Sequence, residues 1–537
     1  MSDFDVCIIG AGPVGLTLAL DLSRRGVSCA LIDKELLPGP WPKMERCNAR
    51  TMEIYRRLGV AEAIRARGQA PDGSMDVAIV TSLADPPLVV LRYPTVSAVR
   101  ADIMRSRDGS LPLEPYQLIS QYTLEPILRD AVRRCANVEA HFGSTLLDFN
   151  EEADGISVRL DDGSGTRTLS ARYLVGCDGG SSTVRKQLGI ALEGRGGIGK
   201  MHQIFFRSDD LLDLVSIERA RHYWFADQAK SVIIVQDDGR HFSLHTTLPQ
   251  DTDFAAVIRR LAGCDVRVDI LNVCEWTMHL LVAESYGSKR VFIAGDAAHL
   301  VIPTGGLGMN TGVGDATDLA WKLQAMIAGW GGAALLPSYD VERRAVGRRN
   351  RDASALAAAG LSIWRDVWRP NIRENSPEGA ATRADIARLA QIAQRRSHEM
   401  HGVELGYVYA NSPIVCSEIG APHESDFFHY IPSTSPGCRL PHAWLSDGRA
   451  IQDIIGLGHT LLDFGTKSDT AALETAMERI GAPLEIVRLN EPPAYGIYAR
   501  KLVLVRPDLH VAWRGDELPD DCDAIARVVT GHAASAH

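Results

Sequence analysis

The chain of 537 residues lacks an excess of basic residues, closely spaced cysteine pairs and long apolar runs. Its 57 lysines and arginines face 67 aspartates and glutamates, so the net charge is −10, which argues against a nucleic-acid partner. The ten cysteines form no C-x-x-C motif and no spacing typical of a zinc site or a secreted disulfide framework. We therefore expect no metal site and a chain that functions in the reducing cytoplasm.

One segment, residues 6–20 (VCIIGAGPVGLTLAL), is apolar enough to resemble a targeting sequence. It follows Asp3 and Asp5 instead of the basic residues that precede a signal peptide, and three glycines and a proline interrupt it. No other run reaches the roughly 18 apolar residues that a membrane span needs. The sequence predicts a soluble protein with no membrane partner.

Aromatic residues make up only 6% of the chain, but apolar residues reach 45% and charged residues 23%, as in ordinary globular proteins. Such a chain can bury a large core, and at roughly 150 residues per domain its length predicts three or four domains. The 48 glycines slightly exceed the average, and the excess is clustered. The glycine clusters are therefore candidates for a binding function.

The first cluster is a G-x-G-x-x-G motif formed by Gly10, Gly12 and Gly15. It lies between a predicted buried strand, DVCIIG, and a predicted helix over residues 14–25. Such glycines let the backbone approach a pyrophosphate at a helix N-terminus, and Asp33, at the end of the next strand, is placed to bind a ribose. The motif predicts a site for an ADP-containing dinucleotide; the alternative is a tight turn without a ligand.

Two later motifs, YLVGCDGGSSTVR at 173–185 and VFIAGDAAH at 291–299, each predict a strand that ends in a turn. In the second, Asp296 has the chemistry to bind a ribityl hydroxyl. The glycine-rich residues 305–314 follow it, and we predict a long helix that begins at about Gly312. Its N-terminal N–H groups would face the flavin edge that becomes anionic on reduction. The alternatives are that Asp178 caps a turn and that Asp296 caps a helix.

In this order the three motifs resemble those of the class A flavoprotein aromatic hydroxylases, the para-hydroxybenzoate hydroxylase-like monooxygenases. The resemblance covers about residues 1–360, including SYDVERR at 338–344. Further stretches are similar to the phenol and chlorophenol hydroxylase branch: ARTMEIYRRLG at 49–59, LGYVYANSPIV at 405–415, PGCRLPHAWL at 436–445 and LVRPDLHVAWRG at 504–515. The last two belong to the thioredoxin-like domain of that branch. Because it lacks C-x-x-C here, we expect it to be structural or to support a dimer.

The resemblance and the strand-like runs in residues 75–120 and 200–285 together predict the architecture. It is an α/β fold with a Rossmann-like FAD-binding domain, an inserted, mostly antiparallel β-sheet domain for the substrate, and a C-terminal thioredoxin-like α/β domain. The predicted divisions are residues 1–75, 121–195 and 286–365 for FAD, 76–120 and 196–285 for the substrate, 366–435 as a helical link and 436–537 for the thioredoxin-like domain. Further helices are predicted over residues 48–66, 122–135 and 380–400.

The resemblance also implies which residues bind FAD. Lys43 stands where relatives usually have arginine. Lysine preserves the positive charge but lacks the planar set of N–H donors of a guanidinium group. Either Lys43 or Arg46 would therefore contact the cofactor. Pro303 matches the proline whose carbonyl faces the reacting centre, and Gln121 matches a flavin-contacting glutamine. The complete predicted set is Gly10, Gly12, Pro13, Val14, Gly15, Asp33, Lys34, Lys43, Arg46, Gln121, Asp178, Gly179, Asp296, Gly308, Met309 and Asn310.

The implied reaction is the hydroxylation of a phenolic ring with NADPH or NADH and O2 through a flavin C4a-hydroperoxide. A base that forms the phenolate would help, because a phenolate is the better nucleophile. Glu45, five residues before Arg50, is the candidate; the alternative is that it pairs with Lys43, Arg46 or Arg50.

The residues predicted to flank the substrate are Tyr223, Phe225, Trp276 and His279, although core packing would explain them equally well. The substrate would be a phenolic or polycyclic aromatic small molecule. Two other functions stay open: a Baeyer–Villiger or epoxidising monooxygenase acting on a polycyclic aromatic polyketide, and an FAD-binding regulator without turnover. We expect a homodimer or a monomer.

Overall fold

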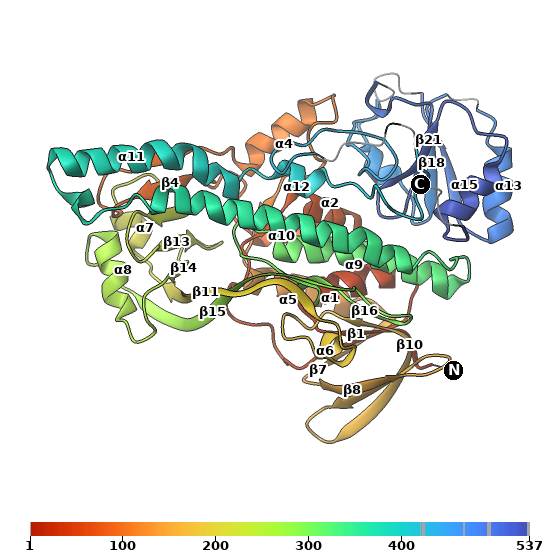
Figure 1. The fold of residues 1–537 in the computed structure, drawn as a ribbon, viewed down its shortest axis with the longest axis horizontal. Coiled ribbons are helices and arrows are strands. Elements are labelled where there is room, and N and C mark those ends of the chain that lie inside the picture. Colours follow the sequence, from red (N-terminus) through yellow and green to blue (C-terminus); the bar gives the residue numbers. More distant parts are fainter. Residues whose placement is uncertain (1, 419, 421–424, 466–467, 491–495, 534–537) are drawn as a thin grey trace.

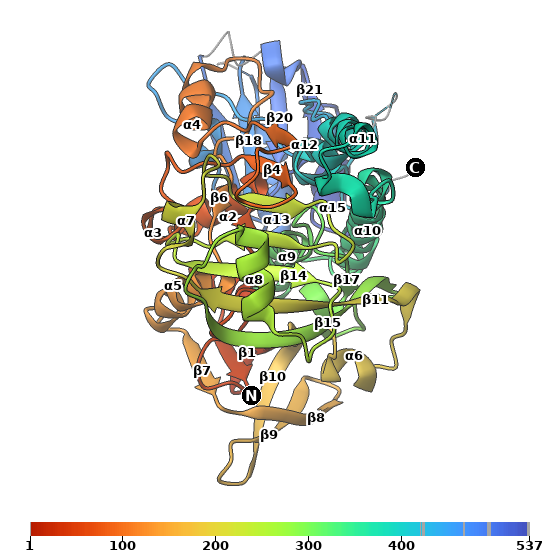
Figure 2. The same cartoon turned by 90° about the vertical axis from the view of Figure 1, so that its left-hand side faces the viewer.

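The computed structural model describes residues 2–418, 420, 425–465, 468–490 and 496–533, and shows helices packed around three main sheets (Figures 1 and 2). The expected mixed α/β fold is confirmed. Parts of the predicted linking region 366–435 and of the predicted C-terminal domain 436–537 lie outside the described residues.

The first sheet contains the N-terminal strand and has seven strands in the order β7-β2-β1-β10-β9-β8, with β16 paired to β10. The pairs β2–β7, β1–β2, β1–β10 and β10–β16 are parallel, as the predicted βαβ unit requires. Strand β1 reads as an almost continuous apolar run because both of its faces are covered. The strands are β1 (Phe4–Ile9), β2 (Cys29–Asp33), β7 (Val138–Phe142), β8 (Thr145–Glu151), β9 (Ile156–Asp161), β10 (Thr166–Gly176) and β16 (Val291–Ile293).

The second sheet has eight strands in the order β17-β15-β11-β14-β13-β12-β4-β5. All of its neighbouring pairs are antiparallel except the parallel pair β12–β4. Figure 2 shows this sheet facing the viewer, with α8 in front of it. Its strands are β4 (Val77–Val80), β5 (Val89–Leu91), β11 (Leu192–Arg207), β12 (His222–Phe225), β13 (Val232–Val235), β14 (His241–Thr246), β15 (Asp269–Ala283) and β17 (His299–Leu300).

The third sheet lies in the C-terminal region, which Figure 1 shows in blue at one end of the molecule. Its order is β19-β18-β20-β21, and β18 is parallel to β19 but antiparallel to β20. A short two-stranded sheet, β3 with β6, lies elsewhere. These strands are β3 (Arg46–Cys47), β6 (Gln117–Leu118), β18 (His459–Asp463), β19 (Leu484–Arg488), β20 (Leu502–Val505) and β21 (Val511–Gly515).

The helices pack on the faces of these sheets, and the long helix α10 crosses the middle of Figure 1. The helices predicted over residues 14–25 and 122–135 lie within two residues of α1 and α5. The helix predicted over residues 48–66 is instead two helices, α2 and α3, and the one predicted over 380–400 begins at Pro377 and ends at Ala393. These and the remaining helices follow in chain order. They are α1 (Pro13–Arg24), α2 (Ala49–Arg57), α3 (Ala61–Arg67), α4 (Val96–Arg105), α5 (Gln121–Arg133), α6 (Thr183–Gln187), α7 (Leu211–Leu214), α8 (Phe254–Ala262), α9 (Gly308–Ala328), α10 (Pro337–Arg365), α11 (Pro377–Ala393), α12 (His401–Leu405), α13 (Ala471–Ile480) and α15 (Cys522–Val529).

Helix α9 begins at Gly308, so the predicted start at about Gly312 was wrong. The glycines do not form a loop there; they allow close packing inside the helix. A Cβ on Gly312 would lie 2.5 Å from a methyl carbon of Val14, and one on Gly314 would lie 2.7 Å from the guanidinium of Arg343. The first turn of α9 therefore packs closely against the start of α1.

In the part of the chain that the structure describes, no helix is both long enough and apolar enough to cross a bilayer. Within the same residues, no group of three or more histidine, cysteine, aspartate or glutamate side chains is arranged to hold a metal ion.

Candidate functional site

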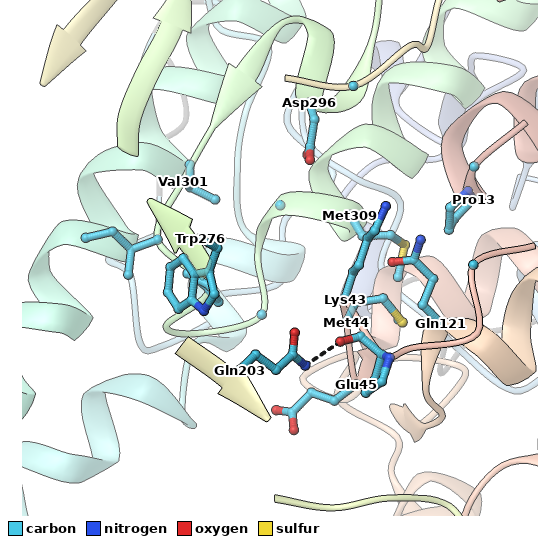
Figure 3. A pocket seen from close by; sticks show the side chains of 18 of the residues that line it. Pro13, Lys43, Met44, Glu45, Gln121, Gln203, Trp276, Asp296, Val301 and Met309 are labelled. Carbon is cyan, nitrogen blue, oxygen red and sulfur yellow. Dashed lines mark hydrogen bonds between the residues drawn. The ribbon is translucent and has the colours of Figure 1, made fainter. Parts of the chain in front are cut away.

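A cavity of about 1530 Å3 lies between the first sheet and the eight-stranded sheet. Ligand pockets for one drug-sized molecule reach about 1000 Å3, so this cavity has room for two ligands side by side. One half is lined by the three motifs singled out in the sequence, and the other half by the eight-stranded sheet and helix α10. Figure 3 shows the junction of the two halves, with Trp276 on one side, Lys43, Gln121 and Pro13 on the other, and Asp296 above and between them.

The G-x-G-x-x-G turn has the close contacts that require glycine. Gly10 has φ +103°, and a Cβ there would lie 2.3 Å from the carbonyl oxygen of Cys177. A Cβ on Gly15 would lie 1.9 Å from the carbonyl oxygen of Gly10. A Cβ on Gly12 would meet no atom within 4 Å, because Gly12 faces the cavity. Gly12 is also the N-cap of α1 and supplies no side chain to the first N–H groups of that helix.

Asp33 ends β2 beside this turn and lines the cavity. Its Oδ2 accepts a hydrogen bond from the backbone N–H of Ala11 at 2.5 Å, and its Oδ1 accepts one from Glu35 at 2.7 Å. The carboxylate is therefore fixed relative to the glycine turn. The neighbouring Lys34 is exposed, and its ammonium lies 3.9 Å from the carboxylate of Glu35.

A second helix N-terminus, that of α9, also opens into the cavity. Gly308, Met309 and Asn310 line it, and no side chain caps this end of the helix. The Asn310 side chain is occupied: its Nδ2 donates to the carbonyls of Gly306 (2.7 Å) and Arg46 (3.2 Å), and its Oδ1 accepts from Asn48 N–H (2.9 Å). Asn310 therefore shapes the loop, and the N–H groups of the first turn are the donors left for a ligand.

Asp296 lies between the two helix ends with its carboxylate directed into the cavity (Figure 3). Among the described residues it has no hydrogen-bond partner, so the helix-cap alternative finds no support. Burial raises the pKa of this carboxyl, with partial opposition from His299 and Lys43. A carboxylate that opens to the cavity and has no partner among the described residues is suited to accept a hydroxyl hydrogen bond from a ligand.

Asp178 and Gln121 differ from Asp296 because their polar atoms already have protein partners. Asp178 accepts from Ser182 Oγ (2.6 Å) and Thr183 N–H (2.7 Å), as the turn-cap alternative expected. Gln121 donates through Nε2 to Glu125 at 2.5 Å. Both residues still line the cavity, as do Pro13, Val14 and Gly179.

Lys43 and Arg46 have different roles. The Lys43 side chain is exposed to the cavity and, within the described residues, has no ion pair. Arg46 instead donates to the carbonyl of Gly305 and lies 3.4 Å from the Glu404 carboxylate. Arg46 thus braces the glycine loop before α9, which leaves Lys43 as the free cation. The carbonyl of Pro303 in the same loop accepts from Gly306 N–H at 2.9 Å.

Glu45 lies at the junction of the two halves and pairs with residues that the sequence did not single out. Its Oε2 lies 2.9 Å from both His222 Nε2 and the Arg221 guanidinium. Burial alone would raise the pKa of Glu45, but Arg221 and His222 outweigh it and hold that pKa well below the usual range. The alternative partners Lys43, Arg46 and Arg50 are not within ion-pair distance of Glu45 in the described structure.

The predicted substrate residues divide between two faces of the sheet. Trp276 lines the cavity, but His279 is on the opposite side of β15 and accepts from Gly197 N–H at 3.3 Å. Tyr223 and Phe225 differ from the prediction, because both are 0% exposed in a core cluster and Trp224 between them lines the cavity. Alternation along a strand allowed either face to be the pocket face, and sequence alone did not distinguish them.

Three cavity-lining histidines were missed, namely His222, His245 and His398. The rings of His222 and His398 lie 5.4 Å apart. Burial lowers the pKa of all three, to about 4 for His245, so they are neutral near pH 7. They come from β12, β14 and the segment before α12, and no sequence motif joins them.

Comparison with known proteins agrees with this geometry. The family profile described as "FAD binding domain" matches residues 3–354, and the one described as "Aromatic-ring hydroxylase, C-terminal" matches residues 433–533. The chain belongs to this family of FAD-dependent aromatic-ring hydroxylases. The expected class A flavoprotein resemblance is thereby confirmed, and the protein is an FAD-dependent aromatic monooxygenase.

Individual relatives match nearly end to end. The FAD-dependent monooxygenase apdD of Emericella nidulans is 33% identical over 98% of this chain and 90% of its own. The tetracenomycin B2 monooxygenase-dioxygenase of Streptomyces olivaceus is 32% identical over 97% of both chains. A structure of RebC with bound 7-carboxy-K252c has a TM-score of 0.90 and 34% identity, and covers 99% of both chains.

The residues of this chain fit FAD. The open space at Gly12 and the uncapped N-terminus of α1 suit a pyrophosphate, and Asp33 suits the adenosine ribose. Asp296 suits the ribityl chain, and the first turn of α9 suits the edge of the isoalloxazine that gains charge on reduction.

Replacing Asp296 with asparagine should weaken FAD binding roughly tenfold to hundredfold, because a hydrogen bond to a charged acceptor is lost. The pKa of Asp296 is raised, so FAD affinity of the wild type should fall as the pH drops through that pKa, and the variant should lack this dependence. Titration of the apoprotein with FAD, followed by flavin fluorescence, measures both effects. Asp265→Asn, at an exposed side chain, is the control. Equal affinities would contradict the role.

Proposed function

We propose that the protein hydroxylates a phenolic ring, using NADPH or NADH and O2, in the half of the cavity lined by α10 and the eight-stranded sheet. The observation that carries this proposal is the continuity of one cavity that combines an FAD-type cradle with an apolar slot. Bound FAD, once reduced, supplies the chemistry that activates oxygen. The chain itself has to orient the ring, exclude water and control the phenol proton.

The slot is suited to a flat ring. Trp224, Val232, Ile234 and Trp276 line it from the sheet, and small residues of α10 line it from the other side. Apolar walls of this kind desolvate an aromatic ring and leave few ways to orient it. Two similar structures contain a bound compound of their own, 7-carboxy-K252c in RebC and aklavinone in aklavinone-11 hydroxylase.

Glu45 remains our candidate for proton control, in a modified form. With its pKa held so low, its carboxylate is a weak base, but it fixes the His222 ring through Nε2 at 2.9 Å. Arg221 Nε donates to the same Nε2 at 3.2 Å, and Nδ1 is buried without a partner in the described residues. We propose that the Glu45–His222 pair, which lines the cavity, controls the phenol proton.

Glu45→Gln should lower the hydroxylation rate by about a hundredfold, at the lower end of the usual contribution of a general base, and should divert NAD(P)H oxidation into hydrogen peroxide. The dependence of the hydroxylation rate on pH should also change in this variant. Product formation and peroxide are measured together from pH 6 to 9. Glu275→Gln is the control, because Glu275 lies on the same sheet and pairs with Lys200. Coupling that stays unchanged across pH would exclude Glu45 from proton control.

The proposed function itself is tested with the purified flavoprotein and a panel of phenols, salicylates, resorcinols and polycyclic naphthols. We expect substrate-stimulated NAD(P)H oxidation and incorporation of one atom from 18O2 into the product. A Baeyer–Villiger enzyme acting on a polycyclic polyketide would instead yield a lactone, and an epoxidising enzyme an epoxide. A regulator without turnover would bind FAD but show no stimulated oxidation, which would overturn the proposal.

The C-terminal region is proposed to be a thioredoxin-like domain with a structural role. Its four-stranded mixed sheet and the packed helices α13 and α15 support this assignment, and its sequence has no C-x-x-C motif. We also propose the domain divisions predicted above, since most strands of the eight-stranded sheet fall within residues 76–120 and 196–285. The sheet extends beyond them only through the first residues of β11 and the short strand β17. Cytoplasmic location and assembly as a monomer or homodimer stay predictions.

A further inference from the structure

Helix α10 forms one wall of the substrate half of the cavity and runs from the first sheet to the eight-stranded sheet (Figure 1). Most of its lining residues are small and recur at the spacing of one helical face, so the wall is flat. They are Ala355, Ala358, Ala359, Leu361, Ser362 and Arg365. The flat wall therefore ends at a charged side chain, the last residue of the helix.

Arg365 is partly buried and, among the residues that the structure describes, forms no ion pair. Its Nη2 donates to the carbonyl of Lys230 at 3.0 Å, and its guanidinium carbon lies 4.8 Å from the ring centre of Trp224. Its Nε is buried and has no hydrogen-bond partner in the described structure. Burial lowers the pKa of Arg365 to about 10, an effect that Asp227 partly opposes, so the group is still cationic near pH 7. A buried cation without a paired anion is costly.

Lys230 lies next to Arg365 and also lines the cavity. It is in the turn between β12 and β13 and has φ +53°, a left-handed conformation that costs a residue other than glycine about 1–2 kcal/mol. The described residues provide no ion pair for its ammonium group. A second free cation is thus held at the same end of the cavity, at a backbone position that glycine would occupy more easily.

The charges that line the cavity are distributed unevenly. Its acidic residues lie around the FAD half, except Glu45, which is already paired with Arg221 and His222. Around the far end of the substrate half, Lys230 and Arg365 are the charged side chains, and Asp227 nearby does not line the cavity. This end therefore carries two positive charges that the cavity wall itself does not neutralise.

We propose that the substrate carries a carboxylate at the end away from the reacting ring, and that Arg365 and Lys230 bind it. This inference rests on the proposed function, because it concerns the substrate of the same site. Arginine presents parallel N–H donors to a carboxylate, and lysine adds a point charge. Stacking on Trp224 orients the guanidinium without neutralising it.

The position of Arg365 also sets a length for the substrate. Ser354 Oγ donates to the carbonyl of Ile302 at 2.7 Å, so this point of α10 adjoins Pro303 and the loop before α9. Arg365 lies eleven residues further along, which is about 16 Å at 1.5 Å per residue. A single hydroxybenzoate is too short to reach from the flavin side to Arg365, whereas an extended aromatic skeleton spans much of that distance.

The test uses three hydroxyaryl carboxylates of increasing length and the neutral carboxamide of each. The probes are 4-hydroxybenzoate, 6-hydroxy-2-naphthoate and 4′-hydroxybiphenyl-4-carboxylate. Isothermal titration calorimetry of the flavin-loaded protein gives each Kd. We expect the preference for carboxylate over carboxamide to increase with length, to at least tenfold for the biphenyl pair. Arg365→Gln should remove that preference, and Arg365→Lys should retain part of it.

Arg369→Gln is the matched control, because Arg369 is exposed four residues further along and donates only to the nearby carbonyls of Asp366 and Trp368. Flavin content and thermal unfolding show whether each variant is folded. If Arg365→Gln does not fold, the Lys230→Gln variant is used instead, and it should lower the preference for carboxylate over carboxamide. Equal affinity for the biphenyl acid and amide in the wild type, or a preference that survives both variants, would overturn the proposal. In that case, NAD(P)H oxidation stimulated by the neutral amides would still support the proposed hydroxylase function. A protein that binds no flavin would contradict both the proposed function and the carboxylate site.

Discussion

Gly12→Ala is expected to lower FAD affinity by roughly a hundredfold while leaving the apoprotein as stable as the wild type. A Cβ at this position meets no protein atom within 4 Å, and the backbone angles of −72° and −179° are open to alanine. The new methyl group would occupy space that we assign to the pyrophosphate. Overpacking and weakened hydrogen bonds to a charged group together cost about 3 kcal/mol. Flavin titration and thermal unfolding of the apoprotein measure the two quantities separately.

Gly15→Ala provides the contrast, because its Cβ would collide with the protein at 1.9 Å from the Gly10 carbonyl oxygen. This variant should lose stability even without FAD, by about 1–3 kcal/mol or more. If Gly12→Ala destabilises the apoprotein as much as Gly15→Ala does, or binds FAD normally, the pyrophosphate is not at Gly12.

Arg506→Met is expected to destabilise the protein by about 3–5 kcal/mol, the usual cost of removing one member of a buried ionic group. The Arg506 side chain is fully buried and bonds three carboxylates: Glu342 at 2.5 Å, Asp508 at 2.8 Å and Asp318 at 2.9 Å. Among the described residues, Lys322 would then be the cation left to neutralise Asp318 and Glu342, to which it is bonded. Denaturant unfolding monitored by both tryptophan and flavin fluorescence gives the change in free energy.

Arg500→Met is the control for that experiment, since Arg500 is in the same region and pairs with Asp516 at a half-exposed position. Exposed ion pairs contribute about 0–1 kcal/mol, so this variant should unfold nearly like the wild type. We also expect the flavin signal of Arg506→Met to be lost at lower denaturant, because Asp318 and Lys322 belong to α9. A change below about 1 kcal/mol would mean that the network is not required for stability.

The features that sequence predicted well are local in the chain. The βαβ unit and the glycine turn depend on residues within about thirty positions, and Asp296 follows directly from the end of a strand. The predicted start of α9 was too late because the glycines were assigned to a loop. Gly312 is needed instead for close packing against Val14, which is nearly 300 residues away in the sequence. Turn chemistry and hydrophobic periodicity do not contain such contacts.

The substrate half shows the same limit. The partners of Glu45 come from β12, and strand alternation alone did not decide whether Tyr223 or Trp224 faces the cavity. Arg365 drew no attention in the sequence because a helix-terminal arginine is ordinary. Its position becomes informative only in the fold, where it donates to the carbonyl of Lys230 and both side chains line the cavity beside an apolar slot.

The network at Arg506 has a consequence for how the protein is made. Glu342 leaves the ribosome 164 residues before Arg506 does, which is a delay of roughly 8–30 s at common rates of synthesis. During that interval Asp318 of α9 and Glu342 of α10 share one cation, Lys322, and lack the second cation that Arg506 later supplies. Cofactor capture should therefore be a late, nearly post-translational event, and a nascent chain that stalls before its last strands should stay colourless.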